Sequence, residues 1–205
     1  MIHVDRQPEP VDFDANVRQK GRRWLAKHPN ALAKDFRPYW RRCIPGMLRC
    51  YARRCAYTAL RIKPGTGVPH VDHFLPKSKC KAAAYEWSNY RLACKVVNDH
   101  KGVREDILDP FEVGDGWFRL ELVALQGLPA PDLDPDLRRK VESTIDALKL
   151  NEDPSLCDAR IEYYEDWVGN EISLRHLRTH FPFLAKELVR QGLVDESDDQ
   201  EATSP

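Results

Sequence analysis

The sequence contains no long hydrophobic run. Nowhere do apolar residues approach the ~20 in succession that a membrane-spanning helix needs. The first ten residues, MIHVDRQPEP, have neither the apolar stretch of a secretory signal nor the pattern of a transit peptide. We therefore expect a cytoplasmic protein without a membrane partner.

Paired cysteines are also missing. The six cysteines include no CxxC pair, and a reducing compartment would keep them as thiols, so we expect no disulfide framework. The 205 residues are 42% hydrophobic and 31% charged, which suits one globular domain or two small ones. A chain of this length buries roughly 70% of the surface that its unfolded form exposes, so folding needs no metal or disulfide scaffold.

The sequence carries no net charge, but its charges are unevenly distributed. Residues 1–104 hold 22 Lys and Arg against 8 Asp and Glu, a balance of +14, and residues 105–205 hold 10 against 24, a balance of −14. Residues 18–63 contain 14 basic side chains and a single acid, Asp35. A phosphate polymer would be attracted to such a segment. The simpler alternative is that a basic half docks on an acidic half within one fold.

Apolar spacing predicts an α+β fold that is mostly helical. Helices are expected over 14–27, 38–54 with a kink near Pro45, 135–149, 155–169, 173–178 and 181–191. A strand is expected at 117–123 and a proline-rich linker at 129–135. We expect a basic helical region (1–54), a core (55–102), a mixed and then helical region (103–194) and a disordered acidic tail (195–205).

The middle third has a strand, strand, helix pattern. Residues 57–62 and 68–74 predict two strands, joined by a turn at 63–67 into a hairpin. Ser88 is a candidate N-cap for a helix that continues to about His100 and ends at Gly102.

Asp72 and His73 lie at the end of the second predicted strand. Neighbours on a strand point to opposite faces, but Leu75-Pro76 ends the strand here and could let both side chains serve one site. Asn98 on the following helix could bring its amide near Asp72. A carboxylate and an amide oxygen suit Mg²⁺ or Mn²⁺, and an imidazole beside the ion suits a general base for phosphodiester hydrolysis.

These residues resemble the HNH endonuclease family, whose ββα-metal fold is a hairpin followed by a helix around one cation. The resemblance rests on VDHFLPKS, WSNYRL and NDHKG, within residues 55–102. More narrowly, VDHFLPKS and YEWSNYRLAC resemble the HNH proteins of bacterial anti-phage systems of the Septu and retron-associated type. The resemblance implies a DNA-cutting enzyme that works beside an ATPase.

By this resemblance, Asp72 and Asn98 would hold the metal and His73 would deprotonate the attacking water. Asn89 would hydrogen-bond the loop backbone and fix the orientation of His73. Because a base must be neutral to accept a proton, we expect activity to rise with pH through about 6.5. Candidate nucleic-acid contacts, chosen on charge alone, are Lys77, Arg91, Lys101, Arg53 and Arg54.

The sequence departs from the HNH pattern in its cysteines. Many relatives bind a structural zinc through two CxxC knuckles, whereas here each knuckle keeps one cysteine, in Cys55-Ala-Tyr-Thr58 and Cys94-Lys-Val-Val97. A tetrahedral zinc needs four ligands, so we expect no structural zinc.

Two other functions stay open. Asp72 could be a turn residue and Asn98 a helix-end signal, in which case the strand–strand–helix unit would be a non-catalytic module that binds nucleic acid or regulates a partner. A nuclease of this type could also act on RNA, because groups that face phosphate do not identify the sugar. The region 103–205 could shape a substrate groove or dock a partner.

Overall fold

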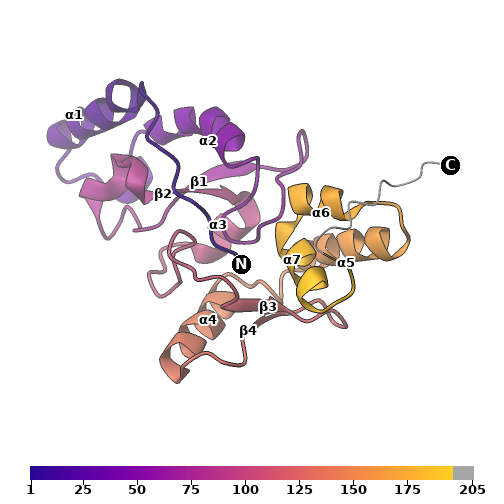
Figure 1. Ribbon diagram of the computed structural model, residues 1–205. Helices are drawn as coiled ribbons and strands as arrows, with labels where there is room; N and C mark the ends of the chain where they lie inside the picture. Colours follow the sequence, from indigo (N-terminus) through magenta and orange to yellow (C-terminus); the bar gives the residue numbers. More distant parts are fainter. Residues whose placement is uncertain (196–205) are drawn as a thin grey trace. The chain divides into compact units, whose positions relative to one another are not determined.

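The computed structural model describes residues 1–195, in which helices accompany two small antiparallel sheets, so the fold class is α+β (Figure 1). The chain divides into two compact units. Residues 5–53 and 62–105 form one, here called the motif unit, and residues 1–4, 54–61 and those from 106 onward form the other, here called the C-terminal unit. These units do not coincide with the segments expected from the sequence, because the basic helices and the motif residues share one unit. The tail predicted at 195–205 lies outside the described residues except for its first.

Two helical segments begin the motif unit. A π-helical turn, Asp14–Arg18, leads directly into α1 (Gln19–Lys27), in agreement with the helix expected at 14–27. A 3₁₀ turn, Tyr39–Cys43, leads into α2 (Ile44–Cys50). Pro45 lies in the first turn of α2, where a missing N–H costs no helical hydrogen bond, so it marks the 3₁₀–α junction rather than a kink.

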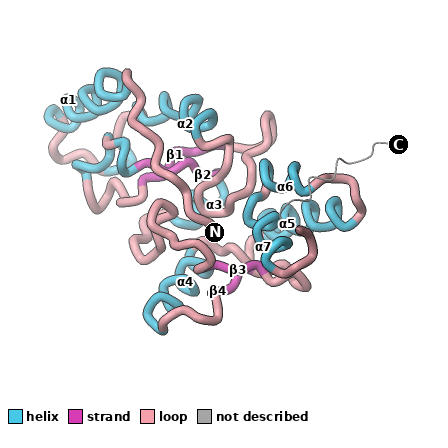
Figure 2. The backbone as a smooth tube through the Cα atoms, in the orientation of Figure 1, coloured by secondary structure: helices cyan, strands magenta, loops and turns pink. Residues whose placement is uncertain are grey.

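The sheet of the motif unit joins two short strands that a long connection separates. Strand β1 (Pro69–His73) pairs antiparallel with β2 (Tyr90–Cys94), and α3 (Lys95–Lys101) follows β2 at once (Figure 2). In this register Asp72 lies opposite Arg91 and His73 lies opposite Tyr90. The order strand, strand, helix is therefore present, but one strand of the predicted pair is a different segment.

The hairpin predicted over 57–74 is wrong. Residues 57–62 form no strand of a hairpin: Tyr57 and Thr58 lie in a turn, Ala59 adopts a positive φ of 61° and the Cys55 N–H donates to the Leu60 carbonyl. Residues 57–61 belong to the C-terminal unit and Ile62 to the motif unit. The helix predicted over 88–100 is wrong in its first half. Strand β2 is buried at four of its five positions, so it shows no alternation by which local spacing could have identified it.

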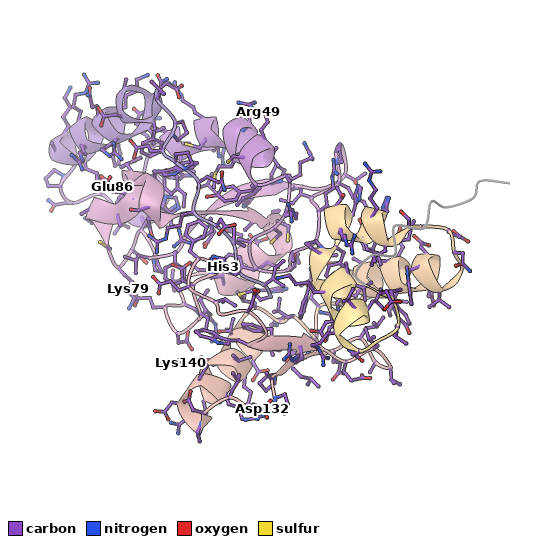
Figure 3. The ribbon with its side chains drawn as sticks, viewed as in Figure 1. His3, Arg49, Lys79, Glu86, Asp132 and Lys140 are labelled. Atoms are coloured by element: carbon purple, nitrogen blue, oxygen red, sulfur yellow. The ribbon has the colours of Figure 1, made fainter. Side chains whose placement is uncertain are left out.

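The connection between β1 and β2 packs closely against α1. It contains two 3₁₀ turns, Lys81–Tyr85 and Trp87–Asn89. A Cβ at Gly21 of α1 would lie 2.1 Å from Cγ of the Tyr85 ring, so only glycine permits this approach. Glu86 accepts hydrogen bonds of 2.7 Å from both Arg18 and Arg22 (Figure 3 labels Glu86). These contacts hold the connection in place.

The described part of the C-terminal unit combines a two-stranded sheet with four helices. Strands β3 (Phe118–Leu120) and β4 (Gly127–Pro129) pair antiparallel, so the predicted strand at 117–123 is shorter than expected and its partner takes the start of the expected linker. The helices are α4 (Pro135–Ala147), α5 (Pro154–Val168), α6 (Leu174–His180) and α7 (Pro182–Arg190), close to their predicted ranges. Side chains of Asp134, Asp153 and Ser173 cap three of them.

Within residues 1–195, no helix has both the length and the apolar character that crossing a membrane would require.

Candidate active site

The two faces of β1 carry different parts of the predicted site. His70 and Asp72 contact residues of α3. His73 contacts the 3₁₀ turn Tyr39–Cys43 and the β1–β2 connection on the opposite face, as expected for neighbours on a strand. His73 is the last residue of the strand. Asp72 and Asn98 therefore lie at one strand–helix interface, and the imidazole of His73 makes its contacts on the other side.

The imidazole of His73 is buried and held in one orientation. Its Nε2 lies 2.9 Å from the carbonyl oxygen of Ala84. The ring also makes edge-to-face contacts with Trp40 and Tyr90, at centroid distances of 4.7 and 5.1 Å. Because a carbonyl only accepts hydrogen bonds, Nε2 must carry the proton of the neutral ring. Nδ1 is then the nitrogen with a lone pair for a proton.

Burial lowers the pKa of His73 from 6.5 to about 3, and the nearby Lys77 ammonium acts in the same direction. The Ala84 carbonyl opposes this shift more weakly. His73 is therefore neutral across the physiological range. The expected rise of activity through about pH 6.5 assumed an ordinary pKa, and the structure moves the titration of this ring to a lower pH.

Asn89 fastens the two ends of the β1–β2 connection. Its Oδ1 accepts a hydrogen bond from the Leu75 N–H at 2.7 Å, and its Nδ2 donates to the carbonyls of Leu75 and Ala83 at 3.0 and 3.1 Å. Ala83 precedes Ala84, whose carbonyl holds His73. Asn89 thus hydrogen-bonds the loop backbone that orients the imidazole.

Lys101 is an internal cation rather than a surface one. Its side chain has no exposed area and its Nζ lies 3.1 Å from Oδ1 of Asp72. The same nitrogen donates to the carbonyls of His73 and Phe74 at 2.9 and 3.1 Å. The three donors of one ammonium are thus matched by three oxygens at the end of β1. The prediction that Lys101 contacts nucleic acid is wrong, because no phosphate can reach it in this fold.

Arg91 is buried as well. Its Nη1 donates to the backbone carbonyls of Ser88 and Tyr90, at 2.8 and 3.0 Å, and its guanidinium lies over the ring of Phe74. The prediction that Arg91 contacts nucleic acid is therefore wrong for the same reason.

Asn98 lies beside His70 rather than in contact with His73. Its Nδ2 is 3.3 Å from Nδ1 of His70. Burial lowers the pKa of His70, opposed by the carboxylate of Asp99. Sequence reasoning assigns His70 a structural or DNA-facing role rather than a place among the ligands. Its place two residues before Asp72, on the same strand face, was the signal that could have found it.

Two basic side chains, those of Lys77 and Arg41, lie near the predicted site. Lys77 is half-buried, with its Nζ 4.3 Å above the ring of Trp40. Burial lowers the pKa of Lys77, the Asp72 carboxylate raises it and Arg41 lowers it further. Arg41 is exposed and also lowers the pKa of His70. Arg41 was part of the basic segment, but its nearness to the motif could not be read from the sequence.

Arg53 and Arg54 are half-buried and fall in different units. The Nε of Arg53 donates to the carbonyl of Ile62 at 3.1 Å, so part of this side chain serves the fold. Their predicted role in binding nucleic acid stays a prediction.

The donor set for a metal ion is small. Among residues 1–195, no three His, Cys, Asp or Glu side chains gather as a metal site. Asp72 and Asn98 supply a carboxylate and an amide at one interface, which fits a hard divalent cation. Oδ1 of Asp72 also pairs with Lys101. Cys55 is a buried thiol of the C-terminal unit and Cys94 a half-buried thiol of the motif unit.

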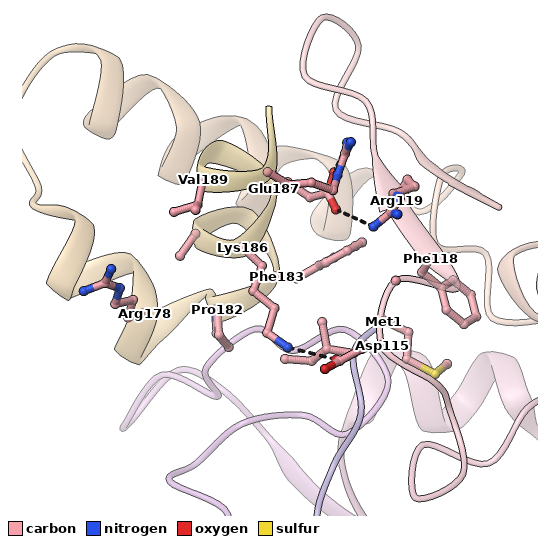
Figure 4. A pocket seen from close by; sticks show the side chains of 14 residues that line it. Met1, Asp115, Phe118, Arg119, Arg178, Pro182, Phe183, Lys186, Glu187 and Val189 are labelled. Atoms are coloured by element: carbon pink, nitrogen blue, oxygen red, sulfur yellow. Dashed lines mark hydrogen bonds and ion pairs between the residues drawn. The ribbon is translucent and has the colours of Figure 1, made fainter. Parts of the chain in front are cut away.

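A pocket of about 580 Å³ lies in the C-terminal unit, against α7 and β3 (Figure 4). Phe118 and Phe183 contribute apolar walls, and Lys186 pairs with Asp115 at 3.0 Å. Buried Glu187 pairs with Arg190. None of the predicted site residues lines this pocket, so it is not part of the site on the motif unit.

No protein-family model matches the chain. The chain is similar to Septu protein PtuB of Bacillus thuringiensis. The two are 26% identical over 160 residues, which cover 74% of this chain and 55% of PtuB. The chain thus spans about half the length of this curated relative.

Proposed function

We propose that this chain is a metal-dependent endonuclease of the HNH type that cuts DNA in a bacterial anti-phage defence system related to Septu. The similarity to PtuB supports the link to defence. The order β1, β2, α3, with Asp72 and His73 ending the first strand, supports an HNH-type ββα unit. The chemistry is argued from the residues of that unit.

Asp72 and Asn98 would hold the cation at the β1–α3 interface. A bound divalent cation would stabilise negative charge on the phosphate and on the departing oxygen. Lys101 keeps the Asp72 carboxylate in place through its contact with Oδ1. Asp72 is thereby held in place before any ligand binds, so less conformational entropy of its side chain is lost on binding.

His73 would accept the proton of the attacking water at Nδ1. The observation that carries the proposal is the 2.9 Å contact between Nε2 and the Ala84 carbonyl, because it leaves Nδ1 as the basic nitrogen. The lowered pKa means that the ring needs no prior deprotonation.

The test is cleavage of supercoiled plasmid DNA by wild type and His73→Ala in Mg²⁺ or Mn²⁺. We expect His73→Ala to lose activity by about 10²-fold or more, as for removal of a general base. DNA affinity, measured by fluorescence anisotropy, should be retained. His28→Ala, at an exposed position beyond α1, is the matched control and should cut like wild type. Full cleavage by His73→Ala, or undiminished cleavage in EDTA, would rule out this mechanism.

A second candidate is a non-catalytic module that binds DNA. The observation in its favour is the fully buried pair of Asp72 and Lys101, which gives Asp72 a structural partner. Such a module would bind DNA equally well in EDTA and would show no cleavage with any divalent ion. The plasmid assay therefore separates the two candidates.

The proposal includes an ATPase partner, as the resemblance to HNH proteins of defence systems implies. Cleavage should be measured with the chain alone and with a co-expressed ATPase, on DNA and on RNA. Cleavage of RNA but not of DNA would replace the substrate in the proposal and leave the roles of the site residues unchanged.

A further inference from the structure

We infer that His70 is a third ligand of the divalent cation, acting together with Asp72 and Asn98. This inference rests on the proposed function, since it concerns the same site. It adds a residue that the sequence motif does not mark and changes the donor set from oxygen alone to oxygen and nitrogen.

The placement of His70 follows from the strand and the helix. His70 and Asp72 are two residues apart on β1 and point to the same face. On α3, Asn98 and Lys101 are three residues apart and share the face that meets them. His70 contacts Asn98 and Asp72 contacts Lys101, so two neighbouring pairs span one interface.

The distance between His70 and Asn98 fits two ligands of one ion. Ligands bound at about 2.1 Å and separated by about 90–110° lie about 3.0–3.4 Å apart. The observed separation of the two side-chain nitrogens is 3.3 Å. Rotating the Asn98 amide by 180° exchanges Nδ2 for Oδ1 at nearly the same place. His70 Nδ1 and Asn98 Oδ1 would then both present lone pairs to the ion.

The same two side chains thus have two compatible arrangements. Without an ion, the Asn98 amide donates a hydrogen bond to His70 Nδ1. After the Asn98 amide rotates, the lone pairs of its Oδ1 and of His70 Nδ1 face each other at this distance and would repel. A cation bound between them would remove this repulsion. A nitrogen ligand also makes the site less suited to Mg²⁺, which prefers oxygen, and more suited to Mn²⁺ or a later transition-metal ion.

The experiment uses Mn²⁺ as the probe and the full chain. Affinity is measured by electron paramagnetic resonance titration for wild type, His70→Gln, His70→Ala and the control His28→Gln. Electron spin-echo envelope modulation then detects nitrogen bound directly to Mn²⁺. Circular dichroism melting in EDTA tests whether each variant folds, and His70→Gln keeps a polar side chain if His70→Ala does not.

We expect wild type and His28→Gln to bind Mn²⁺ with a directly bound ¹⁴N signal. We expect both His70 variants to lose this signal and to bind at least about tenfold more weakly, since even the loss of a group that only supports a ligand costs 10–100-fold. Folded His70 variants that keep the wild-type affinity and nitrogen signal would overturn the inference and leave the proposed function standing. A wild-type protein that binds no Mn²⁺ would overturn both.

Discussion

At the residue scale, Lys101 shows how one buried cation can define the end of a strand. A lysine with no exposed area loses its hydration, and this loss is repaid only if all its donors find partners. Here they meet the Asp72 carboxylate and two main-chain carbonyls. The ammonium therefore fixes both the side chain of Asp72 and the backbone that carries His73.

Lys101→Met should destabilise the protein by about 3–5 kcal/mol, because it removes the ammonium group that pairs with a buried carboxylate. Urea unfolding followed by circular dichroism measures this loss. Lys95→Met is the matched control on the same helix, since Lys95 is exposed and pairs with exposed Asp99. It should change stability little. Equal losses of stability in Lys101→Met and Lys95→Met would show that the buried ion pair stabilises the protein no more than the exposed one.

The lowered pKa of His73 predicts a pH dependence of stability. The ring has a pKa of about 3 in the folded chain and about 6.5 when unfolded. The unfolded state therefore takes up a proton first as the pH falls, so stability decreases from about pH 6.5 downward. Between pH 7 and pH 5.5, the titration of His73 alone should lower the free energy of unfolding by about 1.3 kcal/mol.

The measurement compares urea unfolding at the two pH values, in EDTA, for wild type and His73→Phe. From pH 7 to pH 5.5, the free energy of unfolding should fall by about 1.3 kcal/mol less in His73→Phe than in wild type, whatever the absolute stability of the variant. His28→Gln, which alters an exposed ring, should keep the wild-type dependence. A His73→Phe variant as acid-sensitive as wild type would show that His73 titrates alike in both states.

At the element scale, the connection between β1 and β2 is the segment that the motif depends on most. It is long and has little regular structure, yet Asn89 ties its two ends together. Ion pairs from Glu86 to Arg18 and Arg22 join it to the first helical segments. The orientation of His73 therefore depends on contacts from three separate stretches of the sequence.

Asn89→Ala should loosen this connection. It removes three hydrogen bonds, leaves the Leu75 N–H without its acceptor and should cost about 1–3 kcal/mol. Amide exchange at Leu75 should accelerate in native conditions. Ser88→Ala is the adjacent control, because its side chain is exposed and its carbonyl, which Arg91 uses, is retained. Unchanged exchange at Leu75 in Asn89→Ala would contradict the anchoring role.

The helices and the strands differed in how well the sequence predicted them. Proline in the first turn and a capping Asp mark α4 and α5 locally, so their ranges were close to correct. Strand β2 forms because it pairs with β1, which is 17 residues away from it along the chain at the near ends, His73 and Tyr90. Residues 57–62 have strand-like composition but form no named strand. Pairing partners, which decide both cases, are invisible to local spacing.

At the scale of the whole molecule, charge separates with the two units. The motif unit holds 20 basic residues (22 in 1–104 less Arg54 and Arg61) and 9 acidic ones (8 plus Glu105), a net +11. The C-terminal unit carries the balance of −11. The positive unit is also the one with the HNH-like motif, so its field would draw DNA toward the predicted site.

Arg41→Ala should weaken DNA binding and reduce the slope of log affinity against log salt by about one, since one phosphate contact is lost. The loss should be equal for unrelated DNA sequences. Lys140→Ala, an exposed cation of α4 in the acidic unit, is the control and should leave the slope unchanged (Figure 3 labels Lys140). Anisotropy titrations from 50 to 300 mM NaCl, about a sixfold range, measure both. Equal slopes for Arg41→Ala and wild type would remove Arg41 from the binding surface.

The sequence by itself determined the α+β class, the ranges of α1 and of α4 to α7, and the residues that resemble an HNH motif, because each of these depends on local spacing or residue identity. Tertiary structure decided which strand pairs with β1, that Arg91 and Lys101 are buried, and that His70 faces Asn98. Burial and cross-strand neighbours depend on segments distant in the chain. A charged residue in a motif can therefore bind a ligand at the surface or hold the backbone in place from the interior, and only packing distinguishes the two.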